Sequence, residues 1–419
     1  MQLPVPVPLG LKKSFGFGDR LGLATPGHLE AMRGTGFAPI FAQQSIREMT
    51  RTQRTPADVM RAAQEALASA GHAEPWGADA DHLKTPEDVE RTAAAGFCFF
   101  TIDPSAHVNN GADAMSGPEL AAAVAELDKD RVFGERAWRQ EYLGRTFDLG
   151  TGMGLRFGEE DLYRAVVKYG RATEHAAVMG RAIAAAAGGG GFEIEVSVDE
   201  TDSPTRPLEH LFFGLELRAR GVPNVVSLAP RFIGEFEKGI DYRGDLVAFE
   251  AALRQHVAIA RYCGPYKISV HSGSDKFAAY PAVGRVCGDL LHVKTAGTSY
   301  LEALRVVARV APAVFGEIAE YCRGRFAVDR QSYHISTTEA EIAGLGPYRG
   351  KADEPAWLDE RVGRQLLHVT FGSALTLGAD ARGRRFKDAI LELLTENAGL
   401  HRELLAGHLG RHLTLLNAG

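Results

Sequence analysis

Two histidines stand at the ends of short strand-like segments, among residue types that suit metal and polar-substrate chemistry. His271 closes the run Tyr-Lys-Ile-Ser-Val-His, and His292 lies within Leu-Leu-His-Val-Lys. Successive residues of a β-strand face opposite sides, so each histidine shares its face with polar neighbours and lies away from Ile, Val and Leu. A neutral imidazole placed in this way suits a divalent metal, although two unrelated structural histidines are the simpler interpretation.

A third histidine motif strengthens the metal interpretation. His82 lies in Ala-Asp-His-Leu-Lys, directly after another apolar run. Three imidazoles from His82, His271 and His292 would leave positions open for water or substrate, and would suit Zn, Mn, Co or Ni. The sequence therefore predicts a divalent-metal centre, with the alternative that His82 belongs to an exposed loop before a helix.

Carboxylates beside these histidines are candidates for proton transfer. Asp81 directly precedes His82 and could act as a base, or could cap the helix that follows. Asp199, Glu200 and Asp202 form an acidic cluster after the run Phe-Glu-Ile-Glu-Val-Ser-Val. Strict alternation puts Asp199 on the polar face and Glu200 on the apolar face, but a turn at the strand end could redirect Glu200. The sequence leaves open which of the two reaches the site.

Basic and polar side chains near the same strand ends are candidates for binding substrate oxygens. Lys294, Lys276 and Arg231 could hold a carboxylate or hydroxyl groups, although each alone is more often a surface cation. The segment from Ser272 to Asp275 has the composition of a tight turn, which could bind an oxyanion or simply close the strand. The remaining candidates flank the first predicted strand, and they are Asp19, Arg20 and His28.

Short apolar runs, each followed by polar residues and then a helix signal, predict a (β/α)8 barrel, with a doubly wound open sheet as the alternative. Active sites of such barrels lie at the carboxyl ends of the strands, which is where the polar candidates stand. Thr55-Pro56 and Thr85-Pro86 are helix starts, and Ser116-Gly-Pro-Glu119 is a capping box. The predicted strands are Arg20–Thr25, Phe37–Ala42, Trp76–Ala80, Phe97–Ile102, Phe192–Val198, Val222–Leu228, Lys267–Val270 and Leu290–Val293.

The spacing of these runs divides the chain into four parts. Residues 1–103 and 192–322 are expected to form the two halves of the barrel. Residues 104–191 separate the fourth and fifth predicted strands, too long a gap for an ordinary loop, and are expected to be a mainly helical insertion or lid. Residues 323–419 are expected to be a mostly helical extension. Long helical patterns cover 160–187, 245–262, 298–321 and 388–405.

Composition is typical of a soluble globular protein. The chain has 419 residues, of which 45% are hydrophobic and 24% charged, with a net charge of −6. This charge gives no reason to expect nucleic acid or an anionic membrane as a partner. The N-terminus lacks the basic start and apolar stretch of a signal peptide, so a cytoplasmic location is expected. The four cysteines form no Cys-x-x-Cys pair and are expected to be buried hydrophobes. The oligomeric state is left open, with a homo-oligomer as one option.

Five motifs together resemble the tagaturonate epimerase family, from about residue 14 to about residue 375. They are Gly18-Asp-Arg-Leu-Gly-Leu-Ala-Thr-Pro-Gly-His28, Ala80-Asp-His-Leu-Lys84, Val198-Asp-Glu-Thr201, His271-Ser-Gly-Ser-Asp-Lys276 and His292-Val-Lys-Thr295. The family interconverts tagaturonate and fructuronate with a divalent metal, and related members act on the neutral pair tagatose and fructose. The resemblance implies an isomerase with His82, His271 and His292 as metal ligands, Asp81 as proton acceptor and Glu200 as proton donor.

The implied reaction restricts the chemistry, because the two sugars differ at a carbon that is not adjacent to the ketone. Simple deprotonation there would leave an unstabilised carbanion. Two routes remain: a retro-aldol cleavage that starts at the hydroxyl of that carbon, or migration of the ketone followed by enolisation. In both, a Lewis acid and a proton-transfer pair are useful. We favour the retro-aldol route as a hypothesis.

Two other classes of protein compete with this interpretation. A metal-dependent hydrolase, or another metal-dependent isomerase of sugars or sugar acids, would use the same barrel and ligands. A non-catalytic sugar-acid binding protein would not need a metal with open positions. In every case the expected partner is a small-molecule ketose or keto-uronate.

Overall fold

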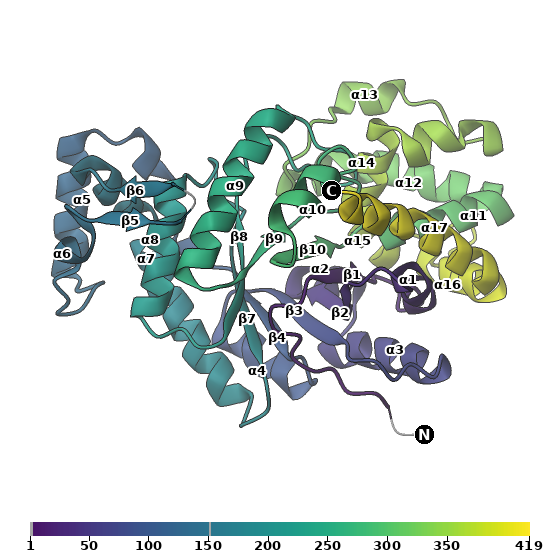
Figure 1. Cartoon of the computed structure of the whole chain (residues 1–419). Helices are drawn as coiled ribbons and strands as arrows, with labels where there is room; N and C mark the ends of the chain where they lie inside the picture. The colour runs from purple at the N-terminus through teal and green to yellow at the C-terminus, as the bar shows by residue number, and fades with distance from the viewer. Residues whose placement is uncertain (1–2, 151) are drawn as a thin grey trace.

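Eight parallel strands close into a barrel in the computed structural model, which describes residues 3–150 and 152–419. The order around the barrel is β1-β10-β9-β8-β7-β4-β3-β2 (Figure 1). The (β/α)8 prediction is confirmed and the open-sheet alternative is wrong. The barrel strands are β1 Ser14–Gly18, β2 Ala38–Ser45, β3 Gly77–Leu83, β4 Phe99–Ile102, β7 Glu193–Val198, β8 Val225–Pro230, β9 Lys267–Val270 and β10 Leu291–Thr295.

The first predicted strand is wrong, because the strand lies upstream of Arg20–Thr25. β1 is Ser-Phe-Gly-Phe-Gly, and Arg20–Thr25 is the loop that leads into α1, Thr25–Met32. Glycine is a poor strand residue, so this pattern is easily missed. Here it permits close packing: a Cβ on Gly18 would lie 2.7 Å from the Cα of Ala296, and one on Gly16 would collide with the side chain of Gln43. The correction puts Asp19 and Arg20 after the first strand.

Helices begin where the capping signals predict them, around the barrel and in the segment 104–191. Thr55 and Thr85 cap α3 and α4 by accepting the backbone N–H of Asp58 and Asp88, and Ser116 opens α5 with the predicted capping box. Their apolar faces join the outward-facing side chains of the strands in one continuous core. The helices of this layer are α1, α3 Pro56–Ser69, α4 Pro86–Ala94, α7 Glu159–Ala186, α8 Pro207–Ala219, α9 Leu246–Cys263, α10 Tyr280–Cys287 and α17 Ala398–Asn417, and short α2 Ile46–Thr52 follows β2.

The segment 104–191 projects from one side of the barrel before it returns as a barrel helix (Figure 1). Its last helix, α7, packs between α4 and α8 as part of the surrounding layer. The part before α7 contacts the loop after β7, where Asn110 accepts the N–H of Asp202 at 3.2 Å and Asp113 accepts the hydroxyl of Ser203. This part contains η1 Ser105–His107, η2 Asn110–Ala114, α5 Gly117–Lys129, α6 Trp138–Tyr142 and the hairpin β5 Thr146–Asp148 and β6 Gly154–Arg156.

A second helical region follows β10 and has its own hydrophobic core. The helical pattern 298–321 is two helices, α11 Thr298–Val310 and α12 Pro312–Asp329, because Pro312 lacks the N–H that would continue α11. After this region α17 returns to the barrel, packs against α1 and α10, and places Leu405, Leu409 and Leu413 in the barrel core. The intervening elements are η3 Arg330–Ser332, α13 Glu339–Gly344, η4 Lys351–Asp353, η5 Pro355–Asp359, α14 Arg361–Val369, α15 Phe371–Thr376 and α16 Phe386–Glu396.

The two faces of the barrel strands differ sharply in polarity. Their outward side chains are apolar, as with Ile194 and Val196 of β7. Among the inward side chains are charged groups that are almost completely buried, namely Asp79, Glu195, Lys267 and Lys294. Barrel interiors are normally filled by branched apolar side chains. Burying charged groups is costly unless each one is paired. The charged interior of this barrel therefore indicates that it serves a functional site.

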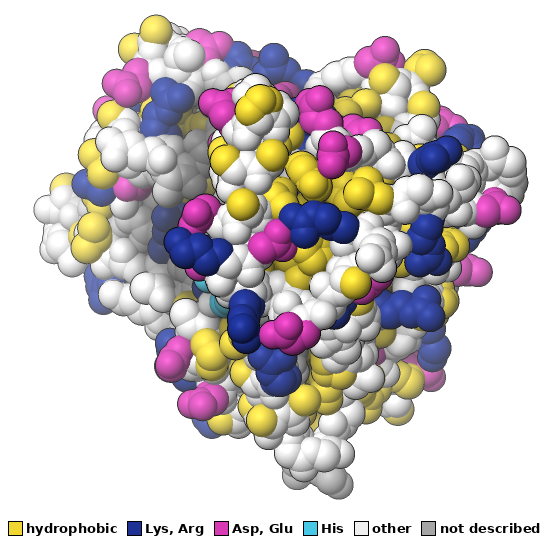
Figure 2. Space-filling model, turned by 90° about the vertical axis from the view of Figure 1, so that its left-hand side faces the viewer, with side chains coloured by type: hydrophobic (Ala, Val, Ile, Leu, Met, Phe, Trp, Pro, Cys, Tyr) yellow, Lys and Arg dark blue, Asp and Glu magenta, His cyan; other side chains and the backbone are white. Residues whose placement is uncertain are grey.

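The helices, the surface charges and the cysteines can each be compared with what the composition predicts. No described helix is long and apolar enough to cross a membrane. On the face shown in Figure 2, basic and acidic side chains are interleaved, and a small histidine surface is visible among them. All four cysteines are free and buried, as predicted.

Candidate active site

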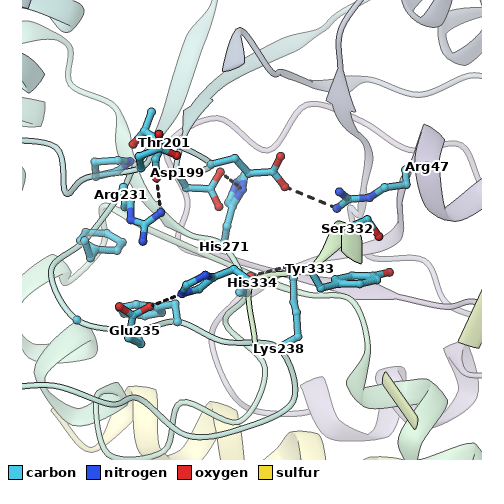
Figure 3. A pocket seen from close by; sticks show the side chains of 17 residues that line it. Arg47, Asp199, Thr201, Arg231, Glu235, Lys238, His271, Ser332, Tyr333 and His334 are labelled. Carbon is cyan, nitrogen blue, oxygen red and sulfur yellow. Dashed lines mark hydrogen bonds and ion pairs between the residues drawn. The ribbon is translucent and has the colours of Figure 1, made fainter. Parts of the chain in front are cut away.

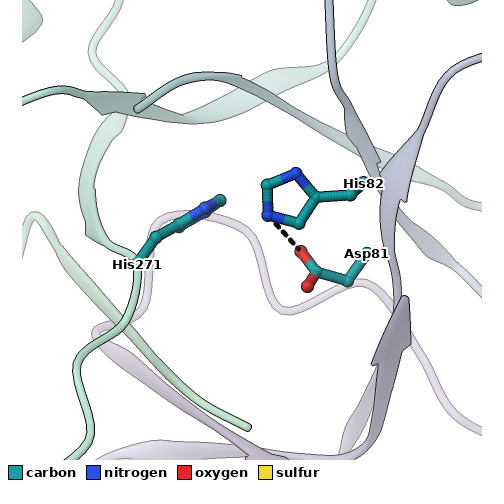
Figure 4. Close-up of side chains that lie close together, drawn as sticks. All are labelled: Asp81, His82 and His271. Atoms are coloured by element: carbon teal, nitrogen blue, oxygen red, sulfur yellow. Dashed lines mark ion pairs between the residues drawn. The ribbon is translucent and has the colours of Figure 1, made fainter. Parts of the chain in front are cut away.

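A β-bulge at the end of β3 brings two consecutive side chains into one site. Two residues of β3, Asp81 and His82, span the interval that one residue of β4 covers. His82 has a left-handed backbone, with φ of 53°. In a regular strand these side chains would face opposite sides, whereas here both point toward His271 (Figure 4). A left-handed backbone at a non-glycine residue is unfavourable and is often retained for function.

His271 follows β9 and meets His82 across the barrel mouth. The two ring centroids are 5.2 Å apart, and ligand atoms of Asp81, His82 and His271 lie within 4.8 Å of one another. The Nε2 atom of His271 is 2.6 Å from Glu195, and Nδ1 is 3.3 Å from Asp199. The Nδ1 atom of His82 is 3.2 Å from Asp103. Each imidazole is therefore oriented by a carboxylate, as ligands of metal sites commonly are.

The carboxylates around the two imidazoles strongly favour positive charge. Burial alone would lower the pKa of His82, but Asp81 and Asp103 raise it to about 10. Burial also opposes the charged form of His271, yet Asp199 and Glu195 raise its pKa to about 9. Burial likewise resists ionisation of Asp199, while His271 holds the pKa of that carboxyl far below its usual range. A site with two imidazoles and several ionised carboxylates suits a cation.

Beneath this pair, Lys294 gathers three carboxylates in the barrel interior. Its Nζ is 2.7 Å from Asp79, 2.8 Å from Asp81 and 2.8 Å from Glu195. Burial opposes charge on Asp81, but Lys294 and the two histidines hold the pKa of Asp81 well below its usual range. Burial, with Asp81 and Glu195 nearby, raises the pKa of Asp79. Lys294 was predicted to bind substrate, and the structure places it where it holds Asp81 in position.

His292 lies apart from the other two predicted metal ligands. It shares the inward face of β10 with Lys294 but stands two residues earlier, which is about 6.6 Å along a strand. Its Nδ1 is 2.9 Å from Ser14, its ring is 5.5 Å from that of Phe99, and its buried Nε2 has no hydrogen-bond partner within the described chain. Burial lowers its pKa to about 3, so it is neutral. None of the described clusters of potential ligands includes His292.

His271 lines a cavity of about 320 Å³ (Figure 3). Asp199 and Glu200 both line it, which answers the question of which carboxylate reaches the site: Asp199 contacts His271, and Glu200 comes within 4.8 Å of His82 and Asp103. Glu200 also pairs with Arg47 of α2 at 3.6 Å. No described residue of 104–191 lines the cavity; the segment over it comes from the C-terminal region and comprises Ser332, Tyr333 and His334.

Arg231 and Arg20, two of the predicted substrate-binding residues, differ in their access to the cavity. Arg231 lines the cavity, and its guanidinium donates to the carbonyl of Thr201. Arg20 is buried, donates to Glu48 at 2.9 and 3.0 Å and stacks 3.5 Å above the ring of Phe371. Arg20 does not line the cavity.

The other four predicted substrate-binding residues are used inside the fold. Asp19 accepts three backbone N–H groups of the loop after β1, and His28 is 2.8 Å from Ser299. Lys276 donates to three backbone carbonyls, and Asp275 pairs with Arg364 at 2.6 Å. Because Lys276 spends its three N–H groups in this way, it has none left for a substrate.

Several residues of the site have no clear signal in the sequence. Asp79 and Glu195 alternate with apolar residues inside their strands, a pattern that could have marked them as inward-facing. Arg47, Lys238 and Tyr333 come from loops and helices with no periodic pattern, so only the fold brings them to the cavity.

Comparisons with known proteins identify the family. A family model for tagaturonate epimerase matches residues 1–416. The tagaturonate/fructuronate epimerase of Thermotoga maritima is 43% identical over 416 residues, which are 98% of this chain and 82% of that protein. The native crystal structure of fructuronate-tagaturonate epimerase from Cohnella laeviribosi matches with a TM-score of 0.91 and 38% identity, over 98% of this chain and 83% of that one, and its complex with one glycerol gives the same values.

These matches confirm the resemblance carried by the five motifs and extend it to nearly the whole chain. The chain belongs to the tagaturonate epimerase family and is an isomerase of the epimerase class.

Proposed function

We propose that this protein interconverts tagaturonate and fructuronate with a divalent metal bound at His82 and His271. The observation that carries the proposal is the meeting of two carboxylate-oriented imidazoles and Asp81 beside a cavity, in a chain 43% identical to a tagaturonate/fructuronate epimerase. The metal would polarise the ketone and its neighbouring hydroxyl.

The donor set supports a transition metal of the Zn, Mn, Co or Ni group. His82 and His271 offer two imidazole ligands beside the carboxylate of Asp81, with one donor atom of each within 4.8 Å of the others. Asp103 and Glu195 hold the imidazoles from behind. The third histidine of the sequence prediction, His292, stays a candidate ligand, and its unpartnered Nε2 is the feature that supports it.

We assign proton transfer to Asp81 and Glu200, which both lie close to His82. Asp81 is ionised by its ion pair with Lys294 and can accept the proton of the substrate hydroxyl. Glu200 is half-exposed at the cavity and can return a proton to the rebuilt hydroxyl. In the retro-aldol route, loss of the hydroxyl proton to Asp81 lets the bond between the epimerising carbon and the carbon beside the ketone break. The epimerising carbon becomes an aldehyde, and the electron pair of the bond forms an enediolate on the other fragment. The aldehyde fragment turns, the enediolate attacks its other face, and the resulting alkoxide takes a proton from Glu200.

An assay of the metal-loaded protein with tagaturonate tests the function. Conversion to fructuronate that a chelator abolishes and added metal restores supports the proposal. Metal binding with no conversion would contradict it and favour the hydrolase alternative. Conversion of fructose to tagatose alone would retain the chemistry and change the substrate.

The route can be tested separately. A three-carbon aldehyde trapped during turnover supports retro-aldol cleavage. Complete incorporation of solvent deuterium at the epimerised carbon would exclude it in favour of enolisation.

A further inference from the structure

The cations that line the cavity differ in how their N–H groups are used. Arg231 donates to the carbonyl of Thr201, and Lys238 donates to the hydroxyl of Ser272 at 2.5 Å. The guanidinium of Arg47 makes no hydrogen bond within the described chain, and its ion pair with Glu200 is long, at 3.6 Å. Arg47 and Arg231 lie on opposite sides of His271 (Figure 3).

On the basis of the proposed function, we propose that Arg47 binds the carboxylate of the keto-uronate substrate and that this carboxylate replaces Glu200 as its partner. A guanidinium offers a planar pair of donors that matches a carboxylate, and this geometry is better than the present contact with Glu200. Both partners of the present pair are well exposed, 40% for Arg47 and 37% for Glu200, so water screens it and exchange is easy.

The dimensions of the substrate place its carboxylate near Arg47. In a keto-uronate the carboxylate carbon is two bonds from the epimerising carbon, which is about 2.5 Å at ordinary bond lengths and angles. A residue that exchanges a proton at the epimerising carbon's hydroxyl must therefore lie close to the cation that holds the carboxylate. Arg47 is the one cation in the described chain that forms an ion pair with Glu200.

Two other cations that the sequence offered for the substrate, Lys294 and Lys276, already have partners within the fold. Lys294 is beside Asp81 but is paired with three carboxylates in the barrel interior. Lys276 is spent on three carbonyls. A substrate carboxylate at either would displace a buried partner, which is costly.

The exchange couples recognition to chemistry. When the substrate carboxylate takes Arg47, Glu200 loses its ion partner and becomes free to serve the reacting hydroxyl. A neutral ketose brings no carboxylate, so it leaves Arg47 paired with Glu200. Arg47 is therefore a specificity-determining residue that separates keto-uronates from neutral ketoses.

Substitution of Arg47 tests this with paired substrates. We expect Arg47→Gln to lower kcat/KM for tagaturonate about 100-fold, mainly through KM, and to change kcat/KM for tagatose less than about threefold. Arg47→Lys should recover part of the loss with tagaturonate. As a control, Arg206→Gln removes a cation after β7 that does not line the cavity, and it should leave both substrates unchanged. Equal losses with both substrates, or no loss with tagaturonate, would overturn the proposal.

A binding measurement separates this proposal from the proposed function. In calorimetric titrations with galacturonate and with galactose, we expect the wild type to prefer galacturonate at least about tenfold and Arg47→Gln to lose that preference. A wild type without the preference, or a variant that keeps it, would overturn the proposal. Because these titrations need no turnover, they hold even if the wild type fails to epimerise tagaturonate.

Discussion

Two clusters of one aspartate and two histidines in this molecule have the spacing of a metal site, and only one of them faces a cavity. The first is Asp81, His82 and His271, and the second is Asp275, His408 and His412; in each, the ligand atoms lie within 4.8 Å of one another. Spacing therefore does not distinguish them. Access does, because His271 lines the cavity and neither His408 nor His412 does.

In the second cluster, the hydrogen-bonding groups already have partners within the protein. The Nε2 atom of His412 accepts the N–H of Asp275 at 3.0 Å, and Nδ1 donates to the carbonyl of His408 at 2.9 Å. Asp275 itself pairs with Arg364 at 2.6 Å and with His408 at 2.5 Å. No imidazole nitrogen of His412 is left for a ligand. This cluster fastens α17 to the turn after β9, where Ser272 and Asp275 have left-handed backbones.

The first cluster therefore uses its histidines in the site, whereas the second cluster holds the first in position. His271 stands at the start of the turn that the second cluster fastens. In the first cluster, carboxylates from the ends of β3, β4 and β7 surround two imidazoles and leave an excess of negative charge for a cation. In the second cluster, the carboxylate of Asp275 pairs with the guanidinium of Arg364 and with His408, whose pKa is raised.

The largest expected effect comes from removing a ligand of the first cluster. His271→Ala should lower kcat at least about 1,000-fold and abolish binding of one equivalent of metal, because it removes one of the two imidazoles proposed to hold the metal. The matched variant His412→Ala should keep the metal. The measurements are the metal content of each variant, by elemental analysis, and its turnover rate. Loss of the metal from both variants, or from neither, would contradict the assignment of the metal to the first cluster alone.

The next effect concerns the cations that balance each cluster. Lys294→Met removes the buried cation that Asp79, Asp81 and Glu195 share, and we expect a loss of about 3–5 kcal/mol in the free energy of unfolding. Urea denaturation measures it. Asp79→Asn combined with Lys294→Met should recover part of the loss, and an unchanged midpoint in the single variant would contradict the assignment.

The elements that sequence predicts well here are those with a regular period or a local cap. Alternation placed His271 and Lys294 on the inward face of their strands, and Thr55 and Thr85 marked their helix starts correctly. The first strand was missed because Gly16 and Gly18, which permit close packing, weaken its pattern. Local composition cannot reveal that β1 must lie so close to its neighbours.

The site was harder to predict for two physical reasons. Alternation alone cannot place both Asp81 and His82 in one site, because this depends on a bulge that only pairing with β4 creates. His292 has the expected type and face, and its separation from His82 and His271 depends on the register between β10 and β9. The cavity also takes Tyr333 and Arg47 from segments far apart in the chain, and no local pattern relates them.

A smaller effect is expected from weakening the fastening cluster. Asp275→Asn keeps the shape of the side chain but removes the charge that faces Arg364 and His408, so we expect a loss of about 2–3 kcal/mol in the free energy of unfolding. Turnover should fall less than about tenfold, with metal content unchanged, because the turn shifts while the ligands remain. Loss of the metal in this variant would show that the two clusters are not separable in function.

The smallest effect is a pH dependence of stability that belongs to the second cluster. His408 faces Asp275, Glu302, Arg364 and His412; burial lowers its pKa, but Asp275 and Glu302 raise it above the ordinary 6.5. A histidine whose pKa is raised by folding stabilises the protein fully below its unfolded pKa, and this contribution disappears as the pH rises through the folded pKa. The difference in unfolding free energy between wild type and His408→Gln should therefore be greatest near about pH 6, at about 1 kcal/mol or less, and should shrink toward about pH 9. A difference that grows over this range would show that His408 is neutral in the folded protein. The second cluster would then lack the positive charge on His408 that pairs with Asp275 and holds α17 to the turn after β9.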